Sequence, residues 1–239
     1  MQTVRLGVLA TCVALAAVVP SWAAMRDGGV LMSTEGSVQA RTTTLPHWHA
    51  AAVRSVYMPG DALMTGRRSR AEVAYADGTI SRLAPSSILH FPQQAQESFG
   101  RLLLGRLWLK VAKQHSPIAV HTPAAVATVV GTELIVAVDG EDNTRVTCLE
   151  GQVNVQGLQG SEVALKAGQT LDVRMGAAAE PAQPVDIKRL RAADPLFATV
   201  KQDTGPEDDD PEGYKALLRQ LRDNGQAPEA PPAPAPDAP

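Results

Sequence analysis

Short apolar runs alternate with turn residues from about Val30 to Arg174. The runs are four to seven residues long, rich in Val, Leu and Ile, and separated by Gly, Pro, Asn or Asp. Apolar and polar side chains alternate within many of them, which is the period of a strand that buries one face. Turn signals about every 8–12 residues are typical of sandwiches, barrels and β-solenoids. The pattern therefore predicts an all-β domain of roughly a dozen short strands.

Two hairpins stand out in this pattern. Residues 71–76 alternate and lead through Asp77-Gly78 into residues 79–83. Asp-Gly between two such runs is typical of a type I′ turn, whose two central residues both need positive φ. Residues 134–138 and 144–149 flank a polar loop in the same way. Because the loops leave no room for crossovers, we expect successive strands to pair. The regularity favours an elongated, solenoid-like stack, with a sandwich-like arrangement as the alternative.

The first 24 residues have the pattern of a signal peptide. Arg5 precedes the uncharged apolar run Leu6–Val19, and Ser21-Trp22-Ala23 places small residues where a signal peptidase reads them. We expect cleavage after Ala23 or Ala24 and a periplasmic or secreted protein. An uncleaved anchor is the alternative, but the run is shorter than the ~20 apolar residues that span a bilayer. We therefore expect no lasting membrane span.

The composition changes after Met175. Residues 176–184 have the composition of a linker, and residues 186–193 predict one or two helical turns capped by Asp186. An acidic stretch, 203–212, leads into a second short helix in the predicted linker-and-helix region 176–226. Residues 227–239 are rich in Ala and Pro and predict an extended, disordered tail.

Charge and cysteine content narrow the function. A net charge of −3 is not the footprint of a nucleic-acid-binding protein. Cys12 lies in the signal segment, so Cys148 is the one thiol expected in the exported protein. Alternation places Val146 and Cys148 on one strand face, which predicts a buried, inert thiol. A reactive or dimer-forming thiol is the alternative.

Several motifs follow one another in a fixed order between about Glu35 and Val173. They include Thr122-Pro123, the run Gly131-Thr132-Glu133, the turn Glu150-Gly151 and the later turn at Gly168. In this order they resemble the FecR domain, whose hallmark is a TP-x-A-x-A-x-V-x-G-T-E run followed by LEG-x-V. The resemblance implies an exported all-β module, expected here over residues 30–175.

The first recognised members of this family are membrane regulators of sigma factors whose periplasmic FecR domain senses an outer-membrane receptor. We expect neither their cytoplasmic segment nor their membrane helix here, so anti-sigma activity does not carry over. What the resemblance implies is a module, not an enzyme, that binds another cell-envelope protein in signalling or assembly. A glycan-, peptidoglycan- or small-ligand-binding module is the alternative.

The motif residues predict a structural skeleton. Thr-Pro is extended, Gly131 allows a bend or bulge between two apolar strands, and the glycines at residues 105, 151 and 168 are expected in turns. The alternative is a binding constellation of Thr122, Thr132 and Glu133. We favour the skeleton because the run does not combine a nucleophile, a base and an oxyanion donor. The expected structural residues are Thr122, Pro123, Gly131, Thr132, Glu133, Glu150, Gly151 and Gly168.

Two further clusters suggest binding chemistry. His47 and His49 share a strand face at i and i+2 and could hold zinc or copper. A further ligand would have to come from His90, His115, His121 or a carboxylate. Exposed loop histidines are the simpler interpretation, and we expect no cofactor. A mild basic patch comprises Arg101, Arg106, Lys110 and Lys113. A solvated sheet face is the simpler interpretation of this patch, and an anionic docking site is the alternative.

Overall fold

The computed structural model describes residues 28–92, 99–113 and 117–198. The expected signal peptide, acidic stretch, second helix and tail, as well as His115, lie outside these residues. The described elements are β1 (Gly29–Glu35), β2 (Val38–Arg41), β3 (His49–Ala50), β4 (Val56–Tyr57), β5 (Ala62–Thr65), β6 (Arg70–Tyr75), β7 (Ile80–Leu83), β8 (Ile88–His90), β9 (Gly100–Lys110), β10 (Ile118–His121), β11 (Ala125–Val129), β12 (Glu133–Val138), β13 (Thr144–Glu150), β14 (Gln152–Gly157), β15 (Val163–Lys166), β16 (Gln169–Val173), β17 (Gln183–Pro184), α1 (Ile187–Ala193) and the 3-10 turn η2 (Pro195–Phe197).

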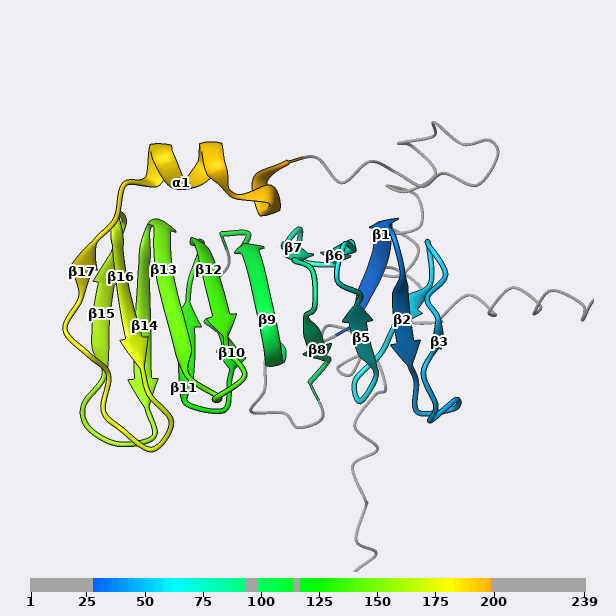
Figure 1. The fold of residues 1–239 in the computed structure, drawn as a ribbon, viewed down its shortest axis with the longest axis horizontal. Coiled ribbons are helices and arrows are strands. Elements are labelled where there is room, and N and C mark those ends of the chain that lie inside the picture. Colours follow the sequence, from blue (N-terminus) through cyan, green and yellow to red (C-terminus); the bar gives the residue numbers. More distant parts are fainter. Residues whose placement is uncertain (1–27, 93–98, 114–116, 199–239) are drawn as a thin grey trace, which may run out of the picture.

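The strands form two facing sheets that share β9. Sheet A runs in the order β4, β1, β6, β7, β9, β12, β13, β16, β17. Sheet B runs in the order β3, β2, β5, β8, β9, β10, β11, β14, β15. Figure 1 shows the strands side by side along the long axis of the molecule. The fold is thus all-β, as predicted, and combines the elongation of a solenoid with the two layers of a sandwich.

The expectation that successive strands pair is only half right. The hairpins β6–β7, β10–β11, β12–β13 and β14–β15 form as expected. Between hairpins, however, the chain crosses to the other sheet, so that β11 pairs with β14 and β13 with β16. Each connection between hairpins therefore passes from one sheet to the other instead of joining neighbours in one sheet.

Strand β9 changes sheet at Gly105. Its first half pairs with β8 in sheet B, and its second half, from Gly105 on, pairs with β12 in sheet A. Gly105 has a φ of +87°, in the left-handed region that favours glycine. A Cβ there would lie 2.5 Å from Ser87 Cα and 2.6 Å from Ser86 O. Gly105 is therefore a bend inside a strand, not the turn glycine expected from the sequence.

The main core lies between the two sheets. Alternating residues of the strands point inward, and Leu31, Leu63, Leu107, Leu134 and Val153 have no exposed area. An aromatic cluster closes one part of this core. Its rings belong to Tyr57, Tyr75, Phe91 and Phe99, with centroids 4.9 to 6.4 Å apart. Burial raises the pKa of Tyr57 to about 12.

The Asp77-Gly78 hairpin forms, but not with the type I′ turn. Gly78 has a φ of +87°, whereas Asp77 is not among the residues with positive φ. The Asp77 carboxylate instead accepts hydrogen bonds from the Thr79 backbone N–H and hydroxyl, both at 2.8 Å. This local bonding holds Asp77 in the ordinary φ region and leaves the reversal of the chain to the glycine.

The segment after β16 packs against the sheets. Part of the expected linker forms β17 against β16, and the Glu180 N–H donates to Asp172 O at 2.8 Å. Helix α1 follows with Asp186 as its N-cap, as predicted, because the Asp186 carboxylate accepts from the Arg189 N–H. We call residues 186–198 the strap. In Figure 1, α1 crosses several strands along one side of the stack.

Candidate functional site

The strap covers a second, smaller apolar cluster on the outer face of sheet A. The sheet contributes Ala84, Trp108, Ile135 and Leu149, and the strap contributes Leu196, which is 1% exposed. Phe197 stands edge-on to Trp108, with ring centroids 6.4 Å apart. Below the strap, this face of sheet A is therefore built like the centre of a protein interface, in which buried aromatic and leucine side chains are ringed by charges.

Glu133 links the family motif to this face. It begins β12, and its side chain is only 6% exposed. One carboxylate oxygen accepts the Trp108 indole N–H at 2.8 Å, and the other accepts from the Arg191 guanidinium of the strap at 2.7 Å. A buried carboxylate needs such donors, because removing a charged group from water without compensating partners costs several kcal/mol. Glu133 thus fixes both the indole and the strap.

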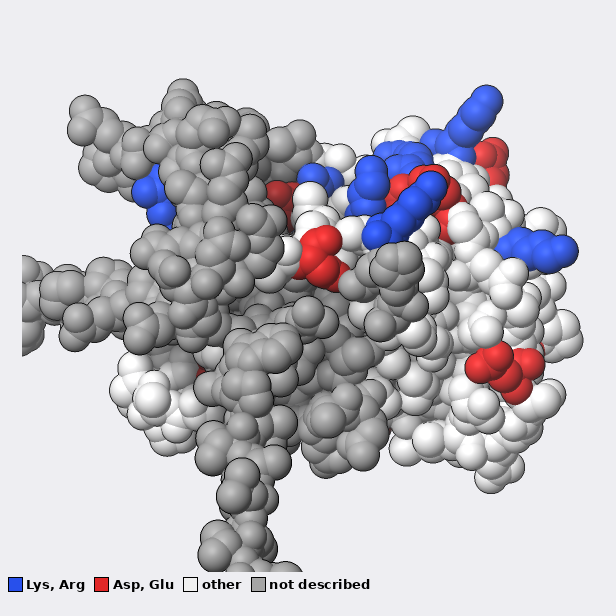
Figure 2. Space-filling model, turned by 180° about the vertical axis from the view of Figure 1, so that it is seen from behind, with Lys and Arg blue, Asp and Glu red and all other residues white. Residues whose placement is uncertain are grey.

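A second ion pair fastens the strap. Asp194, whose side chain is 4% exposed, pairs with Arg106 of β9. The same carboxylate accepts the Leu196 N–H at 3.0 Å and so caps η2. Figure 2 shows Lys and Arg gathered with Asp and Glu along the margin where α1 lies in Figure 1. Along the strap, a positive group, Arg191, is thus followed by a negative group, Asp194, and each pairs with a group of opposite charge on sheet A.

The other motif residues bond within the fold. The Thr122 hydroxyl donates to Ala125 O at 2.8 Å, and the Thr132 hydroxyl donates to Gln152 O at 3.0 Å. Pro123 follows Thr122 in the turn between β10 and β11. Gly131, Gly151 and Gly168 all have φ between +60° and +80°, and Glu150 is exposed beside its turn. The structure gives Thr122, Thr132 and Glu133 different partners and does not join them through a shared hydrogen bond.

The histidine pair lies beside a sheet edge. The His47 and His49 rings are 6.1 Å apart, and His49 Nδ1 lies 3.1 Å from the backbone oxygen of His47. Between them in the sequence, Trp48 lies under the Arg41 guanidinium. The guanidinium carbon is 5.3 Å from the centroid of the Trp48 ring. Within residues 28–92, 99–113 and 117–198, no group of three or more His, Cys, Asp or Glu could hold a metal ion. In this part of the chain, nothing completes a metal site around the pair.

The expected basic patch is divided between the sheets. Arg101 pairs through β8 in sheet B, whereas Arg106 and Lys110 belong to the half of β9 in sheet A. Because β9 bends at Gly105, charges close in sequence belong to two different sheets. Arg101 therefore does not share one strand face with Arg106 and Lys110.

Cys148 is buried between the sheets, as predicted, together with Val146. Burial raises its pKa to about 11. Its Sγ lies 3.5 Å from Gly151 O. The thiol is therefore a core group that stays protonated at neutral pH.

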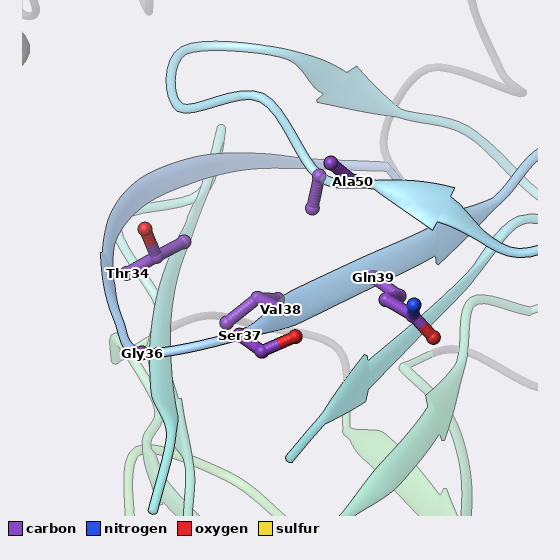
Figure 3. Close-up of a pocket in the computed structure, with 7 residues that line it drawn as sticks. Thr34, Gly36, Ser37, Val38, Gln39 and Ala50 are labelled. Carbon is purple, nitrogen blue, oxygen red and sulfur yellow. The ribbon is translucent and has the colours of Figure 1, made fainter.

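A hollow of 230 Å³ opens beside β2 and β3 (Figure 3). Thr34, Ser37, Gln39 and Ala50 are among its lining residues, and none of the lining side chains ionises. Its volume lies below the ~300–1,000 Å³ of common ligand pockets. The hollow offers hydroxyl and amide groups but no acid–base pair.

Sequence reasoning missed the strap as a packed element. The sequence does place two apolar residues, Leu196 and Phe197, shortly after an acidic one, Asp194. The arginines that contact this segment, however, lie about 90 to 130 residues earlier in the chain. Among the described residues, no helix is long and apolar enough to cross a membrane.

Comparison with known proteins gives one family match. The model of the FecR protein family matches residues 61–154. Two crystal structures of a candidate anti-sigma factor from Parabacteroides distasonis, at 1.65 and 2.50 Å resolution, are similar at 19% identity and a TM-score of 0.48. The alignments cover 55% of this chain and 63% and 62% of theirs, and at this level the likeness carries no functional argument. No curated protein matches. The family match and the ordered motifs coincide from β5 to β14, and this part of the chain, residues 61–154, is a FecR domain.

Proposed function

We propose that this chain is an exported, periplasmic, non-catalytic module that binds another cell-envelope protein in signalling or assembly. The FecR domain of residues 61–154 supports the regulatory part of the proposal, and the signal pattern of residues 1–24 supports export. The partner is another protein of the cell envelope.

The observation that carries the proposal is the use of the motif's polar side chains. Thr122 and Thr132 bond to turns, and Glu133 is committed to Trp108 and Arg191. These side chains stabilise the scaffold, so the motif offers no free base or nucleophile for catalysis. A rigid scaffold whose polar motif serves the fold acts through the surface that it presents.

The glycan-binding alternative loses its main requirement, a row of surface aromatics. Tyr57, Tyr75, Phe91 and Phe99 lie in the core, and Trp108 lies under the strap with 6% exposure. The rings of these five residues are therefore covered by protein, and among the described residues only Trp48 and Phe197 leave an aromatic side chain partly exposed.

The sheet edges are poor places for a partner to add a strand. The outermost strands β3, β4 and β17 have two residues each, and β15 has four. Short edge strands are a common protection against pairing with other chains. We therefore expect the partner to bind a sheet face or a loop, rather than to extend a sheet.

The test is site-specific photocrosslinking in the cell of origin. A photoreactive residue is placed at Leu45, Val130 or Leu158, which are 46%, 53% and 57% exposed. The control position is Leu171, which is 1% exposed and should capture nothing. We expect at least one exposed position to capture a specific receptor or membrane regulator. Export of the protein without specific capture at any exposed position would count against the proposal and shift weight to glycan or small-ligand binding.

A further inference from the structure

Sheet A binds the strap in part through the strap's backbone carbonyl groups. Arg70 donates to Pro195 O at 2.7 Å and to Ala198 O at 3.1 Å. Arg82 donates to Leu196 O at 3.3 Å and lies 4.8 Å from the Trp108 ring centroid. Carbonyl oxygens are common to every peptide, so these contacts would bind any chain that follows the same path. We call the outer surface formed by Arg70, Arg82, Arg106 and Trp108 the arginine face.

Side-chain selection comes from two apolar positions. Leu196 fills the hole between Ala84, Trp108, Ile135 and Leu149, and Phe197 covers the indole edge. Trp and Arg are also the residues most enriched among those that dominate binding energy in protein interfaces. The arginine face therefore has the composition of a peptide-binding site that is already occupied.

Charge complementarity defines two more positions of the ligand. Arg70 and Arg82 pair with Glu35 and Glu72 of sheet A. In contrast, the carboxylate at Arg106 and the guanidinium at Glu133 both come from the strap. When the strap leaves, one cationic and one anionic group on sheet A lose their partners. A replacement ligand must supply a base and, three residues later, an acid, as Arg191 and Asp194 do.

The strap itself is loosely built. Helix α1 has seven residues and buries none of them. Isolated helices shorter than about 12–15 residues are marginal in water, so α1 depends on its few anchors. Those anchors are the buried Asp194 and Leu196 and the half-exposed Arg191, together with the partly buried Ile187, Leu190 and Phe197, which pack against the same apolar cluster. A segment held in this way can detach without opening the core between the sheets.

We propose that the arginine face is a binding site for a short segment of a partner protein, occupied by residues 191–197 of the strap until the partner displaces them. The recognised segment carries a basic residue, an acidic residue three positions later, and leucine-like and aromatic side chains two and three positions after the acid. The inference rests on the proposed function only in taking the partner to be a protein. It adds the surface, the ligand chemistry and the competition with the strap.

The test uses the full chain and a fluorescein-labelled peptide of residues 186–198. In a release variant, Asp194→Lys combined with Leu196→Asp repels the strap from Arg106 and from the apolar hole. Fluorescence anisotropy should show the peptide binding this variant at least tenfold more tightly than the wild type, because the tethered strap competes at millimolar effective concentration, of order 1 mM. Equal binding to both proteins, or no binding to a release variant that keeps the wild-type urea transition, overturns the proposal.

Exchanging the charges of Arg106 and of Asp194 in the peptide distinguishes specific recognition from non-specific binding. For this test the release variant carries Asp194→Ala with Leu196→Asp, so that its own strap offers no charge to residue 106. Adding Arg106→Glu to this variant should weaken binding of the wild-type peptide at least tenfold and should restore binding of a peptide carrying Asp194→Lys. Binding that ignores both changes overturns the acidic position of the motif and the proposal with it.

A second measurement needs no variant. Hydrogen–deuterium exchange of residues 186–198 in the wild-type chain should accelerate when unlabelled peptide is added in excess. Unchanged exchange at peptide concentrations that saturate the release variant contradicts displacement.

Size-exclusion chromatography tests a second occupant of the arginine face. If the wild type dimerises by exchanging straps, the occupant is a second copy of this chain, and the proposal of a partner protein is overturned. If crosslinking in cells fails but the peptide binds, only the proposed function is contradicted. If crosslinking captures a partner but the peptide does not bind, only this inference is contradicted.

Discussion

Replacement of Gly105 by alanine tests how one strand serves both sheets. Gly105 lies at the point where β9 leaves sheet B, with a φ of +87°. An added Cβ would meet Ser87 Cα at 2.5 Å and Ser86 O at 2.6 Å. Both are backbone atoms, so no side-chain rotation can relieve the contacts. The bend of β9 would have to move away from the loop before β8.

Two effects set the size of the loss. A left-handed conformation costs a non-glycine residue about 1–2 kcal/mol. Overpacking in a tight interior costs about 1–3 kcal/mol more. Gly105→Ala should therefore lower the free energy of unfolding by about 2–5 kcal/mol, a large part of the ~5–15 kcal/mol of a typical domain.

Equilibrium urea unfolding of the full chain measures this loss, with tryptophan fluorescence reporting on Trp108 in β9 itself. The matched control is Gly140→Ala in the loop between β12 and β13, where an added Cβ meets nothing within 4 Å. The control should unfold within about 0.5 kcal/mol of the wild type, as surface substitutions usually do. If Gly105→Ala also stays within that margin, β9 does not bend at this residue and the sharing of β9 between two sheets is wrong.

Four further outcomes are expected. Because burial raises the pKa of Cys148 from 9.0 to about 11, the folded thiol should resist a thiol reagent at pH 8 while the urea-unfolded thiol reacts. The same shift makes the folded state hold its proton longer, so stability should fall as the pH rises from about 9 to 11. The pKa of Asp139 is lowered from 3.8 by hydrogen bonds, chiefly from the Asn143 side chain, so Asp139→Ala should destabilise the protein at neutral pH, with a difference that vanishes as the pH falls through the lowered pKa. NMR titration of the carboxyl and urea unfolding at stepped pH check this effect, and an Asp139 pKa at or above 3.8 would contradict it. Intact-mass measurement of the exported protein should give an N-terminus directly after Ala23 or Ala24, and retention of residues 1–23 would refute cleavage.

Local sequence signals predicted much of the fold. The hairpins around residues 77 and 140, the cap at Asp186 and the buried face of Cys148 each depend on neighbours within a few residues. For such features the period of the pattern and the turn chemistry are sufficient.

The assignment of strands to sheets could not be predicted in the same way. A turn glycine followed by an alternating run looks the same whether the chain returns along its own sheet or crosses the core. Gly105 shows the difficulty, since it interrupts an apolar run as a turn glycine does but carries one strand from sheet B to sheet A. The crossing depends on the packing of Ser86 and Ser87 against it, which sequence spacing does not encode.

The candidate site was hidden for a related reason. The Arg70 contact with Pro195 joins residues 125 positions apart, and the Arg106 contact with Asp194 joins residues 88 apart. Charged residues on a strand and on a short helix each look like solvated surface when they are considered alone. Only the fold shows that these charges meet, and that the motif residue Glu133 lies where they do.

Glu133 also indicates how far the functional unit extends. The family match ends at residue 154, and within it Trp108 satisfies one oxygen of the buried carboxylate. The second oxygen is satisfied by Arg191, which lies beyond the match. A buried carboxylate left with half of its donors is destabilising, so a unit cut before the strap would have to find another cation for Glu133. The buried carboxylate of Glu133 needs a cation, and this need holds the strap in place through Arg191. When the strap leaves, the same need selects a basic residue in any partner that replaces it.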